Sequence, residues 1–106
     1  MILSTTDQVP GREVVSIVGI VAGEAVMGTN VFLDFFAKVR DVVGGRSGSY
    51  QKILKEARDN ALEDLMEEAR SVGADAVIGI DLDYEVMEET GSILMVSANG
   101  TAVKLR

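Results

Sequence analysis

The sequence predicts an α+β fold in which a three-stranded antiparallel sheet packs against a long helix. Three observations lead to this fold class: a β-branched apolar run at residues 14–22, an apolar stripe of helical period at 50–72, and an alternating pattern at 74–87. The expected order of elements is strand, helix, helix, strand, strand. At 106 residues the chain has the length of one domain, which we expect to span residues 1–106.

The first strand is expected at Val14–Ala22, and its almost continuous apolar character predicts that both of its faces are covered. Gly19 and Gly23 fall on one face, where they would admit either a bulge or the close approach of another backbone. The preceding segment Met1–Thr6 could add a small strand.

The first helix is expected at Val31–Val43, where it contains all three phenylalanines. Thr29 or Asn30 can cap its start, and Gly44 ends it. This segment carries more apolar surface than a short helix on the outside of a monomer needs.

The second helix is expected at Tyr50–Val72, with Ser49 as its cap and Gly73 as its end. Its apolar stripe follows the helical period, at Tyr50, Ile53, Leu54, Ala57, Ala61, Leu65, Ala69 and Val72. Acidic and basic residues, Glu68 among them, occupy the remaining faces.

The last two strands form a hairpin around a turn at Glu88–Gly91. In Ala74–Met87 one face is expected to hold Ala76, Ile78, Ile80, Leu82, Tyr84 and Val86, and the other Asp75, Val77, Gly79, Asp81, Asp83 and Glu85. The final strand runs from Ser92 to Leu105. Asn99 and Gly100 within it indicate a bulge in a continuous strand or, alternatively, a second hairpin.

Composition excludes several classes of function. The 17 acidic residues outnumber the 10 basic ones, and the formal charge of −7 argues against nucleic acid or anionic membranes as partners. The chain contains no cysteine and no histidine, which removes thiolate and imidazole ligands, cysteine nucleophiles and the commonest general base. Without a secretory signal or a long apolar segment, we expect a soluble cytoplasmic protein that needs no cofactor.

Three long strands leave two long sheet edges whose backbone groups need hydrogen-bond partners. Strand pairing with neighbouring subunits would supply those partners and would also cover the apolar surplus of the first helix. The sequence therefore predicts a closed homo-oligomer.

Four blocks of residues resemble those of the YbjQ family, a group of small prokaryotic proteins of unknown function. The blocks are Val42–Ser47 with Tyr50, Ala57–Arg58, Gly73–Asp81 and Ser97–Val103. The resemblance, which runs from Val14 to the C-terminus, implies a YbjQ-like subunit, also similar to a dodecin subunit, that assembles into a ring. It further implies a pentamer, with a decamer of two rings as an alternative, and it brings a heavy-metal-binding label but no catalytic residues.

The first candidate site is the loop made of Gly44, Gly45, Arg46 and Ser47, together with Ser49. Successive N–H groups of such a loop, a following helix N-terminus and the Arg46 guanidinium are suited to binding a small anion. The alternative is a plain turn between helices, in which Arg46 pairs with an acidic residue and a serine caps the helix.

The second candidate site consists of Asp81, Asp83 and Glu85, whose oxygens are ligands that hard cations prefer. Alternate residues of a strand stand about 6.5–7 Å apart, however, so a solvated acidic face is the alternative. The sequence thus favours a non-enzymatic oligomeric scaffold or small-ligand-binding protein. A cation-binding protein and an enzyme with an inter-subunit site stay as alternatives.

Overall fold

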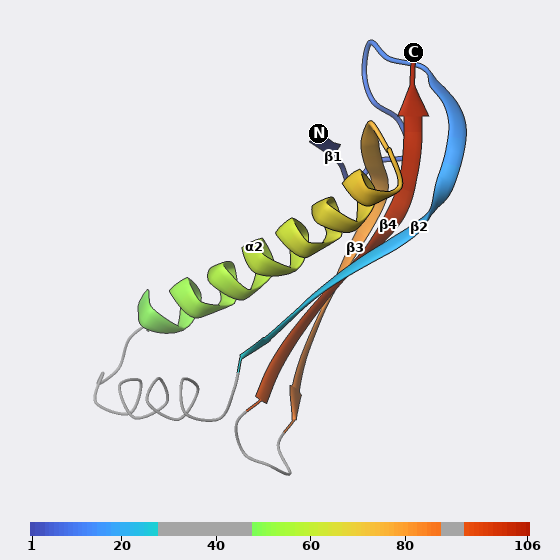
Figure 1. Cartoon of the computed structure of the whole chain (residues 1–106). Helices are drawn as coiled ribbons and strands as arrows, with labels where there is room; N and C mark the ends of the chain where they lie inside the picture. Colours follow the sequence, from blue (N-terminus) through green and yellow to red (C-terminus); the bar gives the residue numbers. More distant parts are fainter. Residues whose placement is uncertain (28–47, 88–92) are drawn as a thin grey trace.

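The protein is described by a computed structural model over residues 1–27, 48–87 and 93–106. These residues form a mixed sheet of four strands with a long helix lying obliquely across one face (Figure 1). The elements are β1 (Ile2–Leu3), β2 (Val14–Met27), α2 (Gly48–Ser71), β3 (Ala76–Met87) and β4 (Ile93–Leu105). The α+β class and the antiparallel arrangement of the three long strands are confirmed. The prediction of a three-stranded sheet was wrong by one strand.

The additional strand is β1, which pairs in parallel with the start of β3. The order of strands across the sheet is β1-β3-β4-β2. The pairing continues beyond β1, because the N–H of Gly79 donates to the carbonyl of Thr6 at 2.8 Å and that of Ile80 to the carbonyl of Ser4 at 3.1 Å. A strand of two residues is too short to show a period of two, so the sequence pattern indicated it only weakly.

Helix α2 packs on the sheet through small side chains. Ala57, Ala61, Leu65 and Ala69 are fully buried, as the apolar stripe predicted, whereas Val72 is exposed. The helix begins at Gly48, so Ser49 lies inside its first turn and does not precede the helix.

The C-terminal end of α2 is closed by Gly73, as predicted. Gly73 has a φ of 77°, and its N–H donates to the carbonyl of Arg70 at 3.0 Å. The N–H of Ala74 donates to the carbonyl of Ala69, also at 3.0 Å. These two bonds form a Schellman motif, which satisfies the last carbonyls of the helix.

A β-bulge in β3 overturns the predicted assignment of its faces. Ile78 pairs with Thr101 and Asp81 with Asn99, so two residues of β3, Gly79 and Ile80, lie opposite Gly100. Gly79 has a φ of 61°, the left-handed conformation that a glycine bulge requires. The bulge moves Ile80 and every following alternate residue onto the face where Val77 lies.

Strand β4 is continuous through Asn99 and Gly100, which confirms the single strand and excludes the second hairpin. The bulged residues, however, belong to β3. Gly100 has its own constraint, because a Cβ there would stand 2.5 Å from Cγ1 of Val77.

Gly23 is the point where α2 and the sheet come closest. A Cβ on Gly23 would overlap the carbonyl oxygen of Ala61 and the amide nitrogen of Leu65, and would stand 2.8 Å from Leu65 Cα. The close approach of another backbone predicted for this glycine is confirmed. A Cβ on Gly19 would meet no atom within 4 Å. Gly19 lies instead at a shift in the pairing register between β2 and β4.

The sheet face opposite α2, here called the outer face, is covered only in part by the described residues. Close to the C-terminal end of the chain, Val9 in the segment before β2 packs against Ala76 and Val103. These three residues form a second small core. Further along β2, the side chains of Ile17 and Ile20 are 74% and 84% exposed. The described residues of one chain therefore do not provide the cover on both faces that the sequence predicted for the first strand.

Two predicted elements lie outside the described residues: the helix at Val31–Val43 and the turn at Glu88–Gly91.

Replacing Gly23 with alanine is expected to lower the free energy of unfolding by about 3 kcal/mol, because the added Cβ collides with the backbone of α2. Gly19→Ala is the matched control, since a Cβ at Gly19 meets nothing within 4 Å. Urea unfolding followed by far-UV circular dichroism, at one protein concentration, measures both variants. Equal stability of the two would contradict the close approach.

Candidate functional site

The predicted anion-binding loop falls mostly outside the described residues. Gly44, Gly45, Arg46 and Ser47 are not among them, and Ser49 is described only as part of the α2 backbone. The loop therefore stays a prediction.

The predicted cation ligands lie together on the outer face of β3. Asp81, Asp83 and Glu85 pair in register with Asn99, Ser97 and Met95 of β4, and all three acidic side chains are exposed. Because the three occupy alternate positions of one strand, their carboxylates are held apart. Within residues 1–27, 48–87 and 93–106, no three acidic side chains come close enough to hold a metal ion together.

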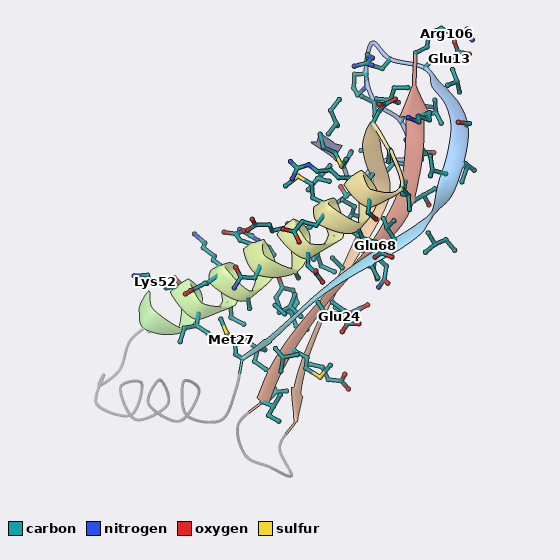
Figure 2. The ribbon with its side chains drawn as sticks, in the orientation of Figure 1. Glu13, Glu24, Met27, Lys52, Glu68 and Arg106 are labelled. Carbon is teal, nitrogen blue, oxygen red and sulfur yellow. The ribbon has the colours of Figure 1, made fainter. Side chains whose placement is uncertain are left out.

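Two carboxylates of α2 reach the edge of the sheet at β2. The N–H of Ala22 donates to Glu68 Oε2 at 2.8 Å, and the N–H of Glu24 donates to Asp64 Oδ2 at 2.9 Å. Figure 2 shows Glu68 beside the point where α2 passes β2. These bonds satisfy backbone groups that an edge strand would otherwise present to another strand.

The sequence placed Glu68 on an outer helix face and gave no sign of this contact. Asp64 and Glu68 follow Ala61 and Leu65 at helical spacing, and Ala61 and Leu65 are the residues that contact Gly23. The glycine and the two carboxylates therefore form one docking unit between α2 and β2.

A groove of about 490 Å³ lies between the N-terminal half of α2 and the ends of β3 and β4 nearest their connection. Its apolar lining comes from Leu54 on α2, from Tyr84 and Val86 on β3, and from Leu94 on β4. In Figure 1 the N-terminal end of α2 diverges from these strand ends. Tyr84 and Val86 face α2 only because of the bulge at Gly79.

Two basic side chains, Lys55 and Arg58, line the same groove from α2. They are three residues apart and therefore project from one side of the helix. The guanidinium of Arg58 forms an ion pair with Asp59 at 3.3 Å, in which the two side chains are 40% and 67% exposed. Sequence reasoning did not identify this groove, because its lining comes from three elements distant in the chain.

The fold and these sites define a small α+β protein without histidine or cysteine chemistry. The sequence model of the YbjQ family, whose description reads "Putative heavy-metal-binding", matches residues 1–106, so the chain belongs to this family. The resemblance noted in the sequence is thereby confirmed.

A solved structure with a similar fold is that of a protein of unknown function from Pediococcus pentosaceus, assigned to the DUF74 family. It has a TM-score of 0.70 and 19% sequence identity, and the match covers 100% of this chain and 98% of that chain. At this level of identity the likeness shows the fold alone.

The residues of this chain do not fit a soft heavy metal. Such ions prefer thiolate and imidazole ligands, and the sequence supplies neither. Thioether sulfur is the remaining soft donor, and two of the five methionines are engaged elsewhere: Met66 Sδ lies 3.6 Å from the cationic Arg70 Nη2, and Met27 packs against the core. In the described part of the chain, no helix is long and apolar enough to cross a membrane.

Replacing Glu68 with alanine is expected to lower the free energy of unfolding by about 1 kcal/mol, because the Ala22 N–H loses its acceptor at the strand edge. Glu67→Ala is the control, since it makes the same helix substitution at an exposed neighbouring position. Thermal unfolding followed by circular dichroism compares them. A Glu68→Ala variant as stable as Glu67→Ala would show that this hydrogen bond contributes nothing.

Adding Ca²⁺, Mg²⁺ or Mn²⁺ is expected to leave the melting temperature unchanged, because Asp81, Asp83 and Glu85 cannot converge on one ion from a single strand. A ligand that binds the folded state would raise that temperature. The measurement is repeated on Asp83→Asn. A rise in the original protein that disappears in this variant would establish a cation site and overturn the expectation.

Proposed function

We propose that this chain is the subunit of a non-enzymatic homo-oligomer that binds a small anionic ligand. One observation carries the oligomer: Ile17 and Ile20, two large aliphatic side chains on one edge strand, are 74% and 84% exposed. Their register partners, Val103 and Thr101, place both on the outer face of the sheet. Covering them would stabilise an assembly by about 1.5–3 kcal/mol for each side chain.

The dimensions of the subunit support this proposal. Its radius of gyration is 16.8 Å, against about 13 Å for a compact domain of this length. Its accessible surface is 6808 Å², against about 5,700 Å² for a compact monomer of 11.3 kDa. A chain with this much surface gains stability when copies of it cover one another.

The edge of β2 indicates where two copies would meet. Among the described strands none lies beyond β2, and the carboxylates of Asp64 and Glu68 occupy the edge at Ala22 and Glu24. Three exposed aliphatic residues of β2, Val15, Ile17 and Ile20, lie in the other half of the strand, whereas a fourth, Val26, lies beyond Glu24. We therefore place the contact between copies on Val14–Ile20.

The resemblance to the YbjQ family supports a ring, for which a pentamer is our expectation and a decamer of two rings the alternative. The ligand part of the proposal rests on the loop Gly44–Ser47, where Arg46 and backbone N–H groups would hold an anion. The non-enzymatic part rests on the lack of histidine and cysteine, which leaves the serines of this loop without the usual base.

Replacing both Ile17 and Ile20 with lysine is expected to reduce the oligomer to the 11.3 kDa chain, because the contact would then bury unpaired charges. Light scattering coupled to size-exclusion chromatography measures the mass at micromolar concentration. Val72→Lys is the control, since Val72 is an exposed aliphatic residue that directly follows α2 and does not belong to β2. If the unaltered protein already has the mass of a single chain, the proposal fails.

A further inference from the structure

We propose that the groove between α2 and β3 binds an amphipathic anion, namely an aliphatic chain that ends in a carboxylate. This inference goes beyond the proposed function, because it adds a second anion site. The site is the described groove, which is separate from the loop around Arg46.

The apolar part of the ligand is indicated by the lining of the groove. Tyr84 and Val86 are 49% and 42% exposed although both lie on the face toward α2, and Leu94, the register partner of Val86, belongs to the core. An alkyl chain in the groove would therefore remove apolar surface of both partners from water and extend the hydrophobic core. A volume of about 490 Å³ lies within the usual size range of small-molecule sites.

Lys55 and Arg58 indicate that the ligand of this groove carries a negative charge. They stand together at the groove in a chain whose formal charge is −7, so the local charge is opposite to that of the whole protein. Among the described residues that line the groove, none is acidic. The ion pair between Arg58 and Asp59 is largely exposed and therefore weak, so the guanidinium is able to turn toward an incoming carboxylate.

Isothermal titration calorimetry of the whole protein tests the ligand class with decanoate, octanoate, decanol and dodecyltrimethylammonium. Decanoate is expected to bind more tightly than decanol, and the cationic amphiphile is expected not to bind. Each added methylene is expected to strengthen binding two- to four-fold, the upper figure being that of a fully buried methylene.

Variants then assign the binding to the groove. Replacing both Lys55 and Arg58 with alanine is expected to weaken decanoate about five-fold and to leave decanol unchanged. Lys52→Ala is the matched control, because Lys52 lies on the exposed N-terminal end of α2 and does not line the groove (Figure 2). Val86→Asp is expected to abolish binding of both ligands. Tyr84→Trp adds a reporter to a chain without tryptophan, and its emission is expected to shift to shorter wavelength on addition of decanoate.

Three results would overturn the inference. Decanoate binding that is unchanged by the Lys55 and Arg58 substitutions would place the ligand elsewhere. Equal binding of the cationic amphiphile would remove the charge argument. A change of oligomer mass in Val86→Asp, without any ligand binding to the original protein, would show that another copy of the chain covers the groove.

The same experiments separate this inference from the proposed function. Inorganic phosphate binding that is lost in Arg46→Ala, without decanoate binding, would support an anion-binding oligomer but reject the groove. Decanoate binding to a single chain would support the groove but reject the oligomer.

Discussion

The contact of Gly23 with the backbone of α2 is the constraint on which the other features of this subunit depend. Because Gly23 has no Cβ, the helix comes close enough for Ala61 and Leu65 to contact the strand through their main chains. Ala57 and Ala69 continue this close packing along the helix, since they too are small and fully buried. A larger residue at any of these positions would push α2 away from the sheet.

This position of α2 has two opposite consequences. Over β2 the helix is so close that Asp64 and Glu68 accept hydrogen bonds from the edge of the strand. Toward the ends of β3 and β4 the oblique helix diverges, and the groove beside Tyr84 forms there (Figure 1). Part of the sheet edge is thereby closed to strand pairing, while the described residues leave an apolar and basic groove beside α2.

The side chains of this protein, more than its fold, argue against the heavy-metal binding named in the family description. Without thiolates or imidazoles, the chain lacks the ligands that heavy metals prefer, and its acidic side chains on β3 stand at alternate positions. We propose partners for two other surfaces: further copies of the chain for the exposed aliphatic residues of β2, and an amphipathic anion for the apolar and basic groove beside α2.

The sequence by itself determined the three long strands, helix α2 with its apolar stripe, the end of that helix at Gly73 and the family, because these depend on residues close together in the chain or on their order. The tertiary structure decided what arises between distant segments: the pairing of β1 with β3, the carboxylates on the edge of β2, and the groove lined by three elements. The bulge at Gly79 shows the difference most clearly. A single left-handed glycine reversed the faces predicted from alternation, because a period of two carries no information about an extra residue until the partner strand fixes the register.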